Sequence, residues 1–466
     1  GIYLPSSVAA ALANLTISIL GKTAVNLNYT IGQNVMNEAI ETCGIRTVLT
    51  SRRFVAKLGA APNAQLVYIE DILSSLSTRD RLVSALIYLL FPSQVIARIH
   101  DSSLPHAPTP PAVVLFSSGS TGTPKGIMLS DANINANLDA LRRIYTMPPD
   151  STVLGSLPFF HAYGLTATLW YPLCIGMGAV YNPNPFDFRM SGTLIRKYAS
   201  VLLPTTPTFM KGYIAKCSSS DLASLKHVVV GAEKMPAELA ATFEEKFGLT
   251  PREGYGCTEL APFAAVNVPD FCDDRVSQKG SKSCTVGRPL PGIAIRIVDP
   301  EKQSPLPYGT PGLLLIKGAN VMEGYWGNAA KTEAVFRNGW YITGDIASVD
   351  RDGFVHLTDR LSRFSKIGGE MVPHEKIERC ILEATPKVVD QDCVVTAVPD
   401  LRKGERLMVV HTSDLDPGQI CRTLREGGMP NLWIPREDAF VKVPEIPVLG
   451  TGKVDLGKVR SLAVQA

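Results

Sequence analysis

Residues 115–126 read Leu115-Phe116-Ser117-Ser118-Gly119-Ser120-Thr121-Gly122-Thr123-Pro124-Lys125-Gly126. The apolar run that begins at Val113 predicts a buried strand before this stretch, and residues 131–145 after it predict a helix from their apolar spacing. Glycines let backbone N–H groups approach an anion closely, hydroxyls add donors, and Lys125 adds positive charge. The stretch therefore predicts a phosphate-binding loop.

This loop differs from the P-loop of kinases and other NTPases. A P-loop has glycine directly before its lysine and Ser or Thr directly after it, where this chain has Pro124 and Gly126. A flexible linker also fits poorly, because a linker need not lie between a buried strand and a periodic helix. The composition favours polyphosphate binding and leaves the reaction open.

Length and composition narrow the class of protein. A chain of 466 residues is too long to pack around a single hydrophobic core, so two or three domains are expected. A net charge of +3 without a basic stripe gives no reason to expect a nucleic-acid partner. The nine cysteines form no C-x-x-C pair, so reduced thiols in a cytoplasmic protein are expected rather than a zinc site or disulfides.

One apolar segment allows two interpretations. No run reaches the roughly 18 residues needed to cross a bilayer, but the run from Leu82 to Phe91 is flanked by Arg79, Arg81 and Arg98. Such a segment fits a helix lying in a membrane interface, at the inner face of the membrane. A core helix with solvated ends fits it as well.

The chain shows an alternating pattern of helices and strands. Helices are expected at residues 8–20 and 33–43, and strands at 24–27 and 47–50, which predicts a parallel sheet covered by helices. Residues 273–312 change to Gly- and Pro-rich loops with short β runs, and a separate α+β piece follows residue 359. The absence of an initiator methionine or signal-like region predicts that the chain begins inside a fold, truncated at its N-terminus.

Five separated motifs point to one family. They are residues 115–126, 254–259, 341–345, 359–370 and 450–453. In this order they resemble the adenylate-forming (AMP-binding) superfamily of acyl-CoA synthetases, peptide-synthetase adenylation domains and luciferases, over nearly the whole chain. Residues 22–30, 157–164 and 366–372 are most similar to the ligase region of bifunctional 2-acylglycerophosphoethanolamine acyltransferase/acyl-ACP synthetase proteins, in which an acyltransferase region precedes the ligase.

The resemblance implies an α/β fold with two domains. Residues 1–361 would form a large AMP-binding domain with βα-layered sheets and a β subdomain. Residues 362–466 would form a small, mobile α+β domain, with the hinge at Ser362. Family members mostly have Asp or Lys at this hinge position, so Ser362 is a departure.

The resemblance also implies the reaction. With ATP and Mg²⁺, a fatty-acid carboxylate would attack the α-phosphorus to give acyl-AMP and pyrophosphate, and a thiol of acyl carrier protein or coenzyme A would then displace AMP. Charge accumulates on phosphate oxygens, so catalysis requires positive charge and positioned donors. The residues implied to bind the nucleotide are Ser117, Ser118, Gly119, Ser120, Thr121, Gly122, Thr123, Lys125, Gly231, Ala232, Glu233, Tyr255, Gly256, Thr258, Asp345 and Arg360.

Individual roles follow from the same resemblance. Thr258 would donate to the α-phosphate, Glu259 would ligate Mg²⁺, and Lys453 would act in catalysis once the small domain closes. The 115–126 loop would hold the β- and γ-phosphates. Tyr255 would face adenine, with residues 231–233 on the other side of the base, although a core tyrosine is an alternative.

Asp345 and Arg360 would share the ribose, with a turn-capping aspartate as the alternative for Asp345. His161 would lie beside the substrate carboxylate, or else pack as a structural histidine. Amino-acid-activating relatives carry Phe-Asp in this region, whereas here Phe160 precedes His161. The lack of an acid favours a simple carboxylate, a fatty acid.

Two alternatives remain. Coenzyme A could replace the carrier protein as acceptor, since Arg363, Lys366, Lys387, Arg402, Lys403 and Arg406 fit either a carrier-protein patch or a solvated face. A non-catalytic nucleotide- or lipid-binding domain is the other. Retention of Lys125, Thr258, Glu259, Asp345, Arg360 and Lys453 argues against it.

Overall fold

The computed structural model describes residues 1–91, 111–118, 124–148, 150–367, 370–385, 392–400, 403–448 and 454–466. The N-terminal part contains a parallel sheet of three strands in the order β1-β3-β4. These strands are β1 (Ile2–Tyr3), β3 (Thr47–Thr50) and β4 (Gln65–Tyr68), and the helices among and after them are α1 (Val8–Ile19), α2 (Gln33–Cys43), α3 (Arg52–Leu58), α4 (Ile69–Ser75) and α5 (Thr78–Leu90). The helix–strand alternation expected from the sequence is confirmed here.

The predicted phosphate loop joins two strands. β5 (Val113–Ser118) pairs antiparallel with β6 (Pro124–Leu129), and α7 (Asp131–Ile144) follows β6. The expectation that the loop runs from a strand directly into a helix is therefore wrong. Ile127 and Leu129 of β6 are buried. Their alternating pattern is too short to predict a strand from the sequence, because Pro124 and Gly126 next to it are typical of loops. β2 (Ala24–Val25) and β18 (Gly324–Tyr325) complete this sheet.

A seven-stranded mixed sheet forms the centre of the molecule, in the order β15-β12-β11-β10-β9-β7-β8. The strands β7 to β11 run parallel to one another. β12 pairs antiparallel with β11, and β15 pairs antiparallel with β12. The strands are β7 (Thr152–Gly155), β8 (Gly178–Tyr181), β9 (Leu202–Thr205), β10 (His227–Val230), β11 (Pro251–Gly256), β12 (Phe263–Val266) and β15 (Arg288–Pro289). The α/β class is confirmed.

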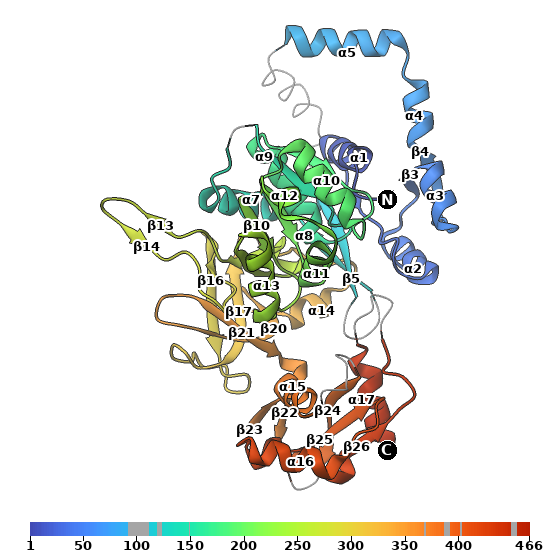
Figure 1. The fold of residues 1–466 in the computed structure, drawn as a ribbon. Helices are drawn as coiled ribbons and strands as arrows, with labels where there is room; N and C mark the ends of the chain where they lie inside the picture. The colour runs from blue at the N-terminus through green and yellow to red at the C-terminus, as the bar shows by residue number, and fades with distance from the viewer. Residues whose placement is uncertain are drawn as a thin grey trace.

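Helices cover this sheet as Figure 1 shows. They are α8 (Ala162–Leu165), α9 (Tyr171–Ile175), α10 (Phe188–Tyr198), α11 (Pro207–Lys216), α12 (Ser219–Leu222) and α13 (Ala237–Phe247), with the π-helical turn η1 (Thr166–Trp170) between α8 and α9. Asp187 caps α10 by accepting from Met190 N, and Gly248 ends α13 in the left-handed conformation.

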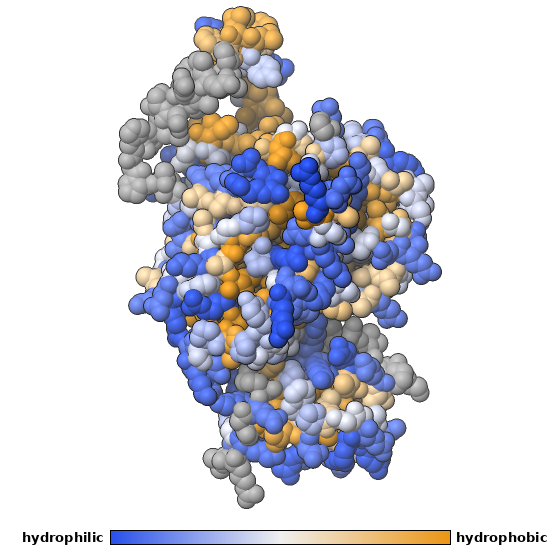
Figure 2. Space-filling view, turned by 90° about the vertical axis from the view of Figure 1, so that its left-hand side faces the viewer, coloured by the Kyte–Doolittle hydropathy of each residue, from blue (hydrophilic) through white to orange (hydrophobic). Residues whose placement is uncertain are grey.

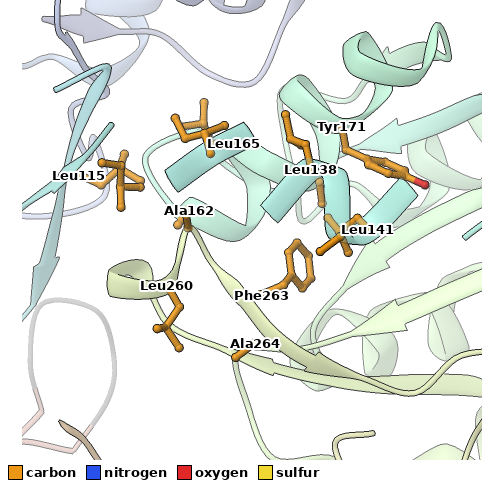
Figure 3. Packing of buried hydrophobic residues seen from close by; sticks show 14 of the residues in the cluster. Leu115, Leu138, Leu141, Ala162, Leu165, Tyr171, Leu260, Phe263 and Ala264 are labelled. Carbon is orange, nitrogen blue, oxygen red and sulfur yellow. The ribbon is translucent and has the colours of Figure 1, made fainter. Parts of the chain in front are cut away.

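The main core joins the two sheets. Leu138 and Leu141 of α7 and Leu165 of α8 pack with Phe263 of β12 in one apolar cluster that also contains Leu115 of β5 (Figure 3). All of these side chains are buried. Since the loop ends of β5 and β6 project from this core, the hairpin has a fixed base.

A β subdomain follows, as expected, but it extends beyond the predicted residues 273–312 to Arg360. Its antiparallel sheet contains β16 (Ile293–Val298), β17 (Gly312–Gly318), β19 (Phe336–Arg337), β20 (Trp340–Val349) and β21 (Val355–Arg360). The hairpin of β13 (Phe271–Cys272) and β14 (Ser277–Gln278) projects from the body, and α14 (Ala329–Ala334) precedes β19.

Residues after 363 build a separate sheet of β22 to β26, shown at the lower end of Figure 1. Its elements are β22 (Phe364–Ile367), β23 (Glu370–Pro373), β24 (Cys393–Asp400), β25 (Gly404–His411), β26 (Phe440–Lys442), α15 (His374–Ala384), α16 (Pro417–Glu426) and α17 (Leu456–Gln465). Two apolar clusters lie entirely within this C-terminal unit.

α5 stands away from the body at the upper end of Figure 1. None of its residues is buried, so the interpretation of the run from Leu82 as a core helix is wrong for the part of the chain that the structure describes. Within those same ranges, no helix combines the length and apolar character needed to cross a bilayer.

Candidate active site

Residues from four parts of the chain meet around the β5–β6 hairpin. Lys125 lies on β6 opposite Ser117 of β5. The adjacent strand β18 brings Tyr325 against Ile127, and the short 3₁₀ turn Thr258–Leu260 carries Glu259. The backbone N–H of Met322 donates to the carbonyl of Glu259 at 2.9 Å, which holds this turn beside β18.

Tyr325 connects a cation to a carboxylate. Its hydroxyl donates to Glu259 Oε1 at 3.1 Å, and Lys125 Nζ lies 5.6 Å from its ring centroid. Burial lowers the pKa of Lys125, with Lys331 adding to this effect and Glu259 opposing it. The Tyr325 side chain is therefore in contact with both a positive charge, which can attract an anion, and a carboxylate, which can bind a metal cation.

A second group lies on β11, β20 and β21. Tyr255 is buried, and its hydroxyl donates to Asp345 Oδ2 at 2.5 Å. Arg360 Nε lies 3.3 Å from Asp345 Oδ1 because β20 and β21 pair these two residues directly. Burial raises the pKa of Asp345, while Arg360 and the Tyr255 hydroxyl favour its charged form. The backbone N–H of Asp345 also donates to Thr343 Oγ1 at 3.0 Å.

Cys257 shows that the two groups belong to one site. Burial raises the pKa of its thiol well above the usual value, and the negative charges of both Glu259 and Asp345 add to that rise. Both carboxylates thus act on the same partly buried side chain. The backbone makes this approach possible at Gly256, where a Cβ would lie 1.9 Å from the carbonyl oxygen of Pro262.

The segment 231–233 follows β10. Ala232 has φ +69°, and the Glu233 carboxylate accepts from Thr208 N at 3.2 Å and Thr208 Oγ1 at 2.7 Å. Glu233 is thereby turned toward the first turn of α11. A Cβ at Gly231 would lie 3.4 Å from the carbonyl oxygen of Gly254, so the two segments are close together.

His161 precedes α8 and is exposed, with its ring 4.6 Å from the ring of Phe160. Both expected roles, beside the substrate carboxylate or packed as a structural histidine, stay predictions for this exposed ring in contact with Phe160. Two residues further on, Tyr163 donates its hydroxyl to the Val229 carbonyl at 2.8 Å and meets the Phe263 ring edge-on at 5.4 Å.

A small apolar cavity of about 30 Å³ lies behind Tyr163. Its lining also includes Tyr145, Ala167, Tyr171 and Phe263. It contains no charged side chain, so its surface suits hydrocarbon or an aromatic ring rather than a charged group.

Several predicted residues cannot be placed. Gly119, Ser120, Thr121, Gly122, Thr123 and Lys453 lie outside the described residues, as do the side chains of Ser118 and Ser362. The backbone of Ser362 is described and lies in the 3₁₀ turn Leu361–Arg363, directly before β22.

Sequence reasoning missed Tyr325, Thr343 and Tyr163. Tyr325 lies on a two-residue strand, so no periodic pattern marks it, and only its pairing with β6 brings it to Glu259. Thr343 lies inside the 341–345 motif without having been singled out. The fold, not the local sequence, brings these residues to the site.

The donor set suits a magnesium ion shared with phosphates. Across the described ranges, no group of three or more His, Cys, Asp and Glu side chains could hold a metal by itself. Mg²⁺ commonly binds through one or two carboxylates together with substrate phosphate oxygens. Glu259 beside Lys125 fits that pattern.

Comparisons with known proteins give a consistent result. The model of a family described as "AMP-binding enzyme" matches residues 1–326. A long-chain-fatty-acid–CoA ligase of Bacillus subtilis is 33% identical over 299 residues, which covers 63% of this chain and 51% of that protein. A feruloyl-CoA synthase of Amycolatopsis is 32% identical over 354 residues, covering 75% of this chain and 69% of that protein.

Solved structures agree with the fold. The ATP-bound MatB of Rhodopseudomonas palustris aligns with a TM-score of 0.74 at 25% identity, over 99% of this chain and 87% of that chain. The o-succinylbenzoate CoA synthetase of Bacillus subtilis aligns with a TM-score of 0.76 at 20% identity, over 98% and 87% of the two chains. At that identity the second alignment shows the fold alone.

Proposed function

Because the chain belongs to the AMP-binding enzyme family, which uses ATP with Mg²⁺, we propose that it activates an apolar carboxylic acid and transfers the acyl group to a thiol. The observation that carries this proposal is the meeting of two groups in one site: Lys125 with Tyr325 and Glu259, and Tyr255 with Asp345 and Arg360. The first group suits phosphates, and the second suits a sugar diol.

In the proposed first step, a substrate carboxylate oxygen attacks the α-phosphorus of ATP. The bond from that phosphorus to the bridging oxygen of the β-phosphate breaks, and pyrophosphate leaves with the electron pair. Lys125 would stabilise the charge on the phosphates, and Thr258 would donate to the α-phosphate. Glu259 would hold Mg²⁺, which neutralises phosphate charge when it is bound.

The ribose would lie at Asp345 and Arg360. Asp345 accepts from Tyr255 and is paired with Arg360, which keeps the carboxylate fixed and ready to accept from a hydroxyl. The adenine would lie between the Tyr255 side and the backbone of residues 231–233. Lys453 keeps its predicted role in stabilising the transition state.

We propose residues 1–361 and 362–466 as the two domains. The separate sheet and the two apolar clusters of the C-terminal unit support this division. Ser362 would then be the hinge, because it lies between the last strand of the β subdomain and the first strand of the small sheet.

The acid is proposed to be a fatty acid. The apolar cavity behind Tyr163 and the absence of an acidic residue at position 161 support an uncharged tail. About 30 Å³ is the volume share of one water molecule, so Tyr163 or Phe263 would have to move to admit a chain. The aromatic lining also supports an aryl acid, which is the second candidate.

For the acceptor we propose the thiol of acyl carrier protein, with coenzyme A as the alternative. Of the basic residues predicted to form a carrier-protein patch, Arg363 is paired with Glu378 and Lys366 with Glu301. Among the described residues Lys403 and Arg406 form no ion pair and would supply the patch, while Lys387 and Arg402 lie outside the described residues. Offering each thiol separately to preformed acyl-AMP distinguishes the two.

The decisive experiment is ATP–pyrophosphate exchange without any thiol. Palmitate, octanoate, ferulate and an amino acid are offered in turn to the wild type, to Glu259→Gln and to Glu323→Gln, a control that removes the same charge from an exposed position nearby. We expect exchange with apolar acids, a loss of about 10²–10³-fold in Glu259→Gln, and no loss in the control. ATP binding without exchange for any acid would instead support a non-catalytic nucleotide-binding domain.

A further inference from the structure

The apolar arm, defined here as residues 69–91 with helices α4 and α5, has no buried residue in either helix. Its large apolar side chains are exposed, among them Leu82, Leu86, Tyr88, Leu89, Leu90 and Phe91. Figure 2 shows them as an apolar projection at the top of the molecule. An isolated helix of 13 residues is marginal in water, so α5 requires something that covers it.

The polar residues of α5 lie at its N-terminal end and its apolar residues toward its C-terminal end, so the apolar side chains do not form a stripe on one face. Its first turn carries Arg79, Asp80 and Arg81, whereas residues 86–91 are six consecutive apolar residues. Since each residue turns the helix by about 100°, six in a row cover every side. A helix that docks in a protein groove presents one stripe and keeps a polar back. The C-terminal end of α5 therefore suits an apolar medium that surrounds the helix on all sides.

A second apolar feature lies at the same end of the molecule. Val8, Leu12 and Ile19 recur on one side of α1 and are exposed, while Ala10, Ala13 and Asn14 face the core. Figure 1 places α1 at the upper end of the body, on the side from which α5 projects.

The positive charge of α5 lies beside its apolar part. Arg79 and Arg81 border that part, whereas Asp80 is engaged by the backbone N–H and the hydroxyl of Ser77. The other two carboxylates of the arm, Glu70 and Asp71, lie on α4 and are engaged by Ser51 and Arg52. With its 13 residues, α5 is about 20 Å long, which is shorter than a bilayer core. It can enter one leaflet but cannot cross.

We propose that the surface of an anionic lipid bilayer covers the apolar arm. The C-terminal end of α5 enters the acyl region, Arg79 and Arg81 meet the headgroups, and the outer stripe of α1 makes the second contact. This proposal does not depend on the acid or the thiol used by the active site.

The test is flotation of the full chain with vesicles of phosphatidylcholine alone and of an equal mixture with phosphatidylglycerol. The variant Leu86→Asn/Leu89→Asn/Leu90→Asn changes residues that are 57%, 77% and 65% exposed. The matched control, Phe271→Asn/Tyr308→Asn/Val464→Asn, changes residues on other elements that are 56%, 74% and 60% exposed. Any general effect of surface hydrophobicity is the same in both.

We expect the wild type to bind the anionic vesicles more tightly. The α5 variant should lose about tenfold in binding for each leucine, and the control should bind as the wild type does. Arg79→Gln/Arg81→Gln should lose about fivefold for each arginine on anionic vesicles and little on phosphatidylcholine.

Two outcomes would overturn the proposal. One is equal vesicle binding by the α5 variant and its control. The other is a wild type that is dimeric without lipid and becomes monomeric only in the α5 variant, since a second copy would then cover the arm. Pyrophosphate exchange with soluble octanoate, measured on the same samples, reports separately whether the proposed activity fails.

Discussion

Tyr325 lies between groups of opposite charge, with its ring near Lys125 and its hydroxyl on Glu259. Groups that orient a metal ligand typically contribute 10–100-fold to metal affinity or activity. Tyr325→Phe keeps the ring and removes only the donor, so we expect pyrophosphate exchange to fall about tenfold and half-maximal Mg²⁺ to rise. Tyr308→Phe, a change at an exposed tyrosine, is the control. Unchanged exchange and unchanged Mg²⁺ dependence in Tyr325→Phe would contradict this role.

Glu253 is a partly buried carboxyl on β11 beside the site. Burial raises its pKa from 4.5 to about 7, so the folded protein keeps this proton in a pH range where the unfolded chain has lost it. The folded state then binds more protons, and its contribution to stability falls as pH rises from about 4.5 to about 7. Glu253→Gln stays neutral, and we expect it to be more stable than the wild type by about 2 kcal/mol above this range.

Urea unfolding at a series of pH values measures this difference. The gain should shrink on the acid side of the range, where the wild-type carboxyl is also neutral. Glu323→Gln, at an exposed position, should show no such dependence. A gain that is constant with pH would mean that Glu253 acts through packing rather than through its charge.

At the scale of elements, regular periodicity was a reliable guide. The helix at residues 33–43 and the strand at 47–50 have the predicted bounds, because apolar spacing records a face that must be buried. β6 was missed because Pro124 and Gly126 give its first half the composition of a loop. The π-helical turn Thr166–Trp170 lies between α8 and α9.

The residues of the candidate site also fall into those that the sequence pattern predicts and those that it does not. Lys125, Glu259, Asp345 and Arg360 lie in contiguous motifs that the sequence displays, whereas Tyr325 reaches the site only through pairing of β18 with β6. Tyr255 was expected either to face adenine or to be a core residue. The structure shows a buried ring whose hydroxyl holds Asp345. The roles of these residues stay predictions until the exchange experiment is made.

The register shift between β11 and β12 depends on Gly256. A Cβ there would lie 1.9 Å from the Pro262 carbonyl oxygen, a backbone atom that cannot move without opening the turn that carries Glu259. We expect Gly256→Ala to lower the free energy of unfolding by about 3 kcal/mol or more. Gly32→Ala, where a Cβ would meet nothing within 4 Å, should change it by less than about 1 kcal/mol. Urea unfolding compares the two, and similar values for both would refute this explanation.

At the scale of the whole molecule, ion pairs and a small apolar contact connect the C-terminal unit to the rest within the part of the chain that the structure describes. Lys234 pairs with Glu375 at 2.7 Å and Lys366 with Glu301, all four with substantial exposure, and Arg363 lies 3.9 Å from Asp359. Leu361 and Phe364 also pack beside Ile346. Exposed ion pairs contribute about 0–1 kcal/mol each, so this arrangement is easily reversed.

Exchanging the charges of Lys234 and Glu375 tests whether this ion pair stabilises the position of the C-terminal unit. Lys234→Glu should shift the population away from the arrangement described here by about fivefold at most, equivalent to about 1 kcal/mol. The double variant Lys234→Glu/Glu375→Lys should restore it, and both effects should weaken at high salt. Small-angle X-ray scattering measures the population, and no recovery in the double variant would exclude the pair as a determinant.

The independent packing of residues 364–466 bears on how such chains diversify in evolution. Every strand of their sheet and both of their apolar clusters come from this stretch alone. Among the described residues, a genetic crossover near Leu361 would therefore sever a few ion pairs and one small apolar contact. We expect hybrids joined there to inherit acid selectivity from the parent that supplies residues 1–361 and to remain folded, so that recombination can explore new substrates without rebuilding a core.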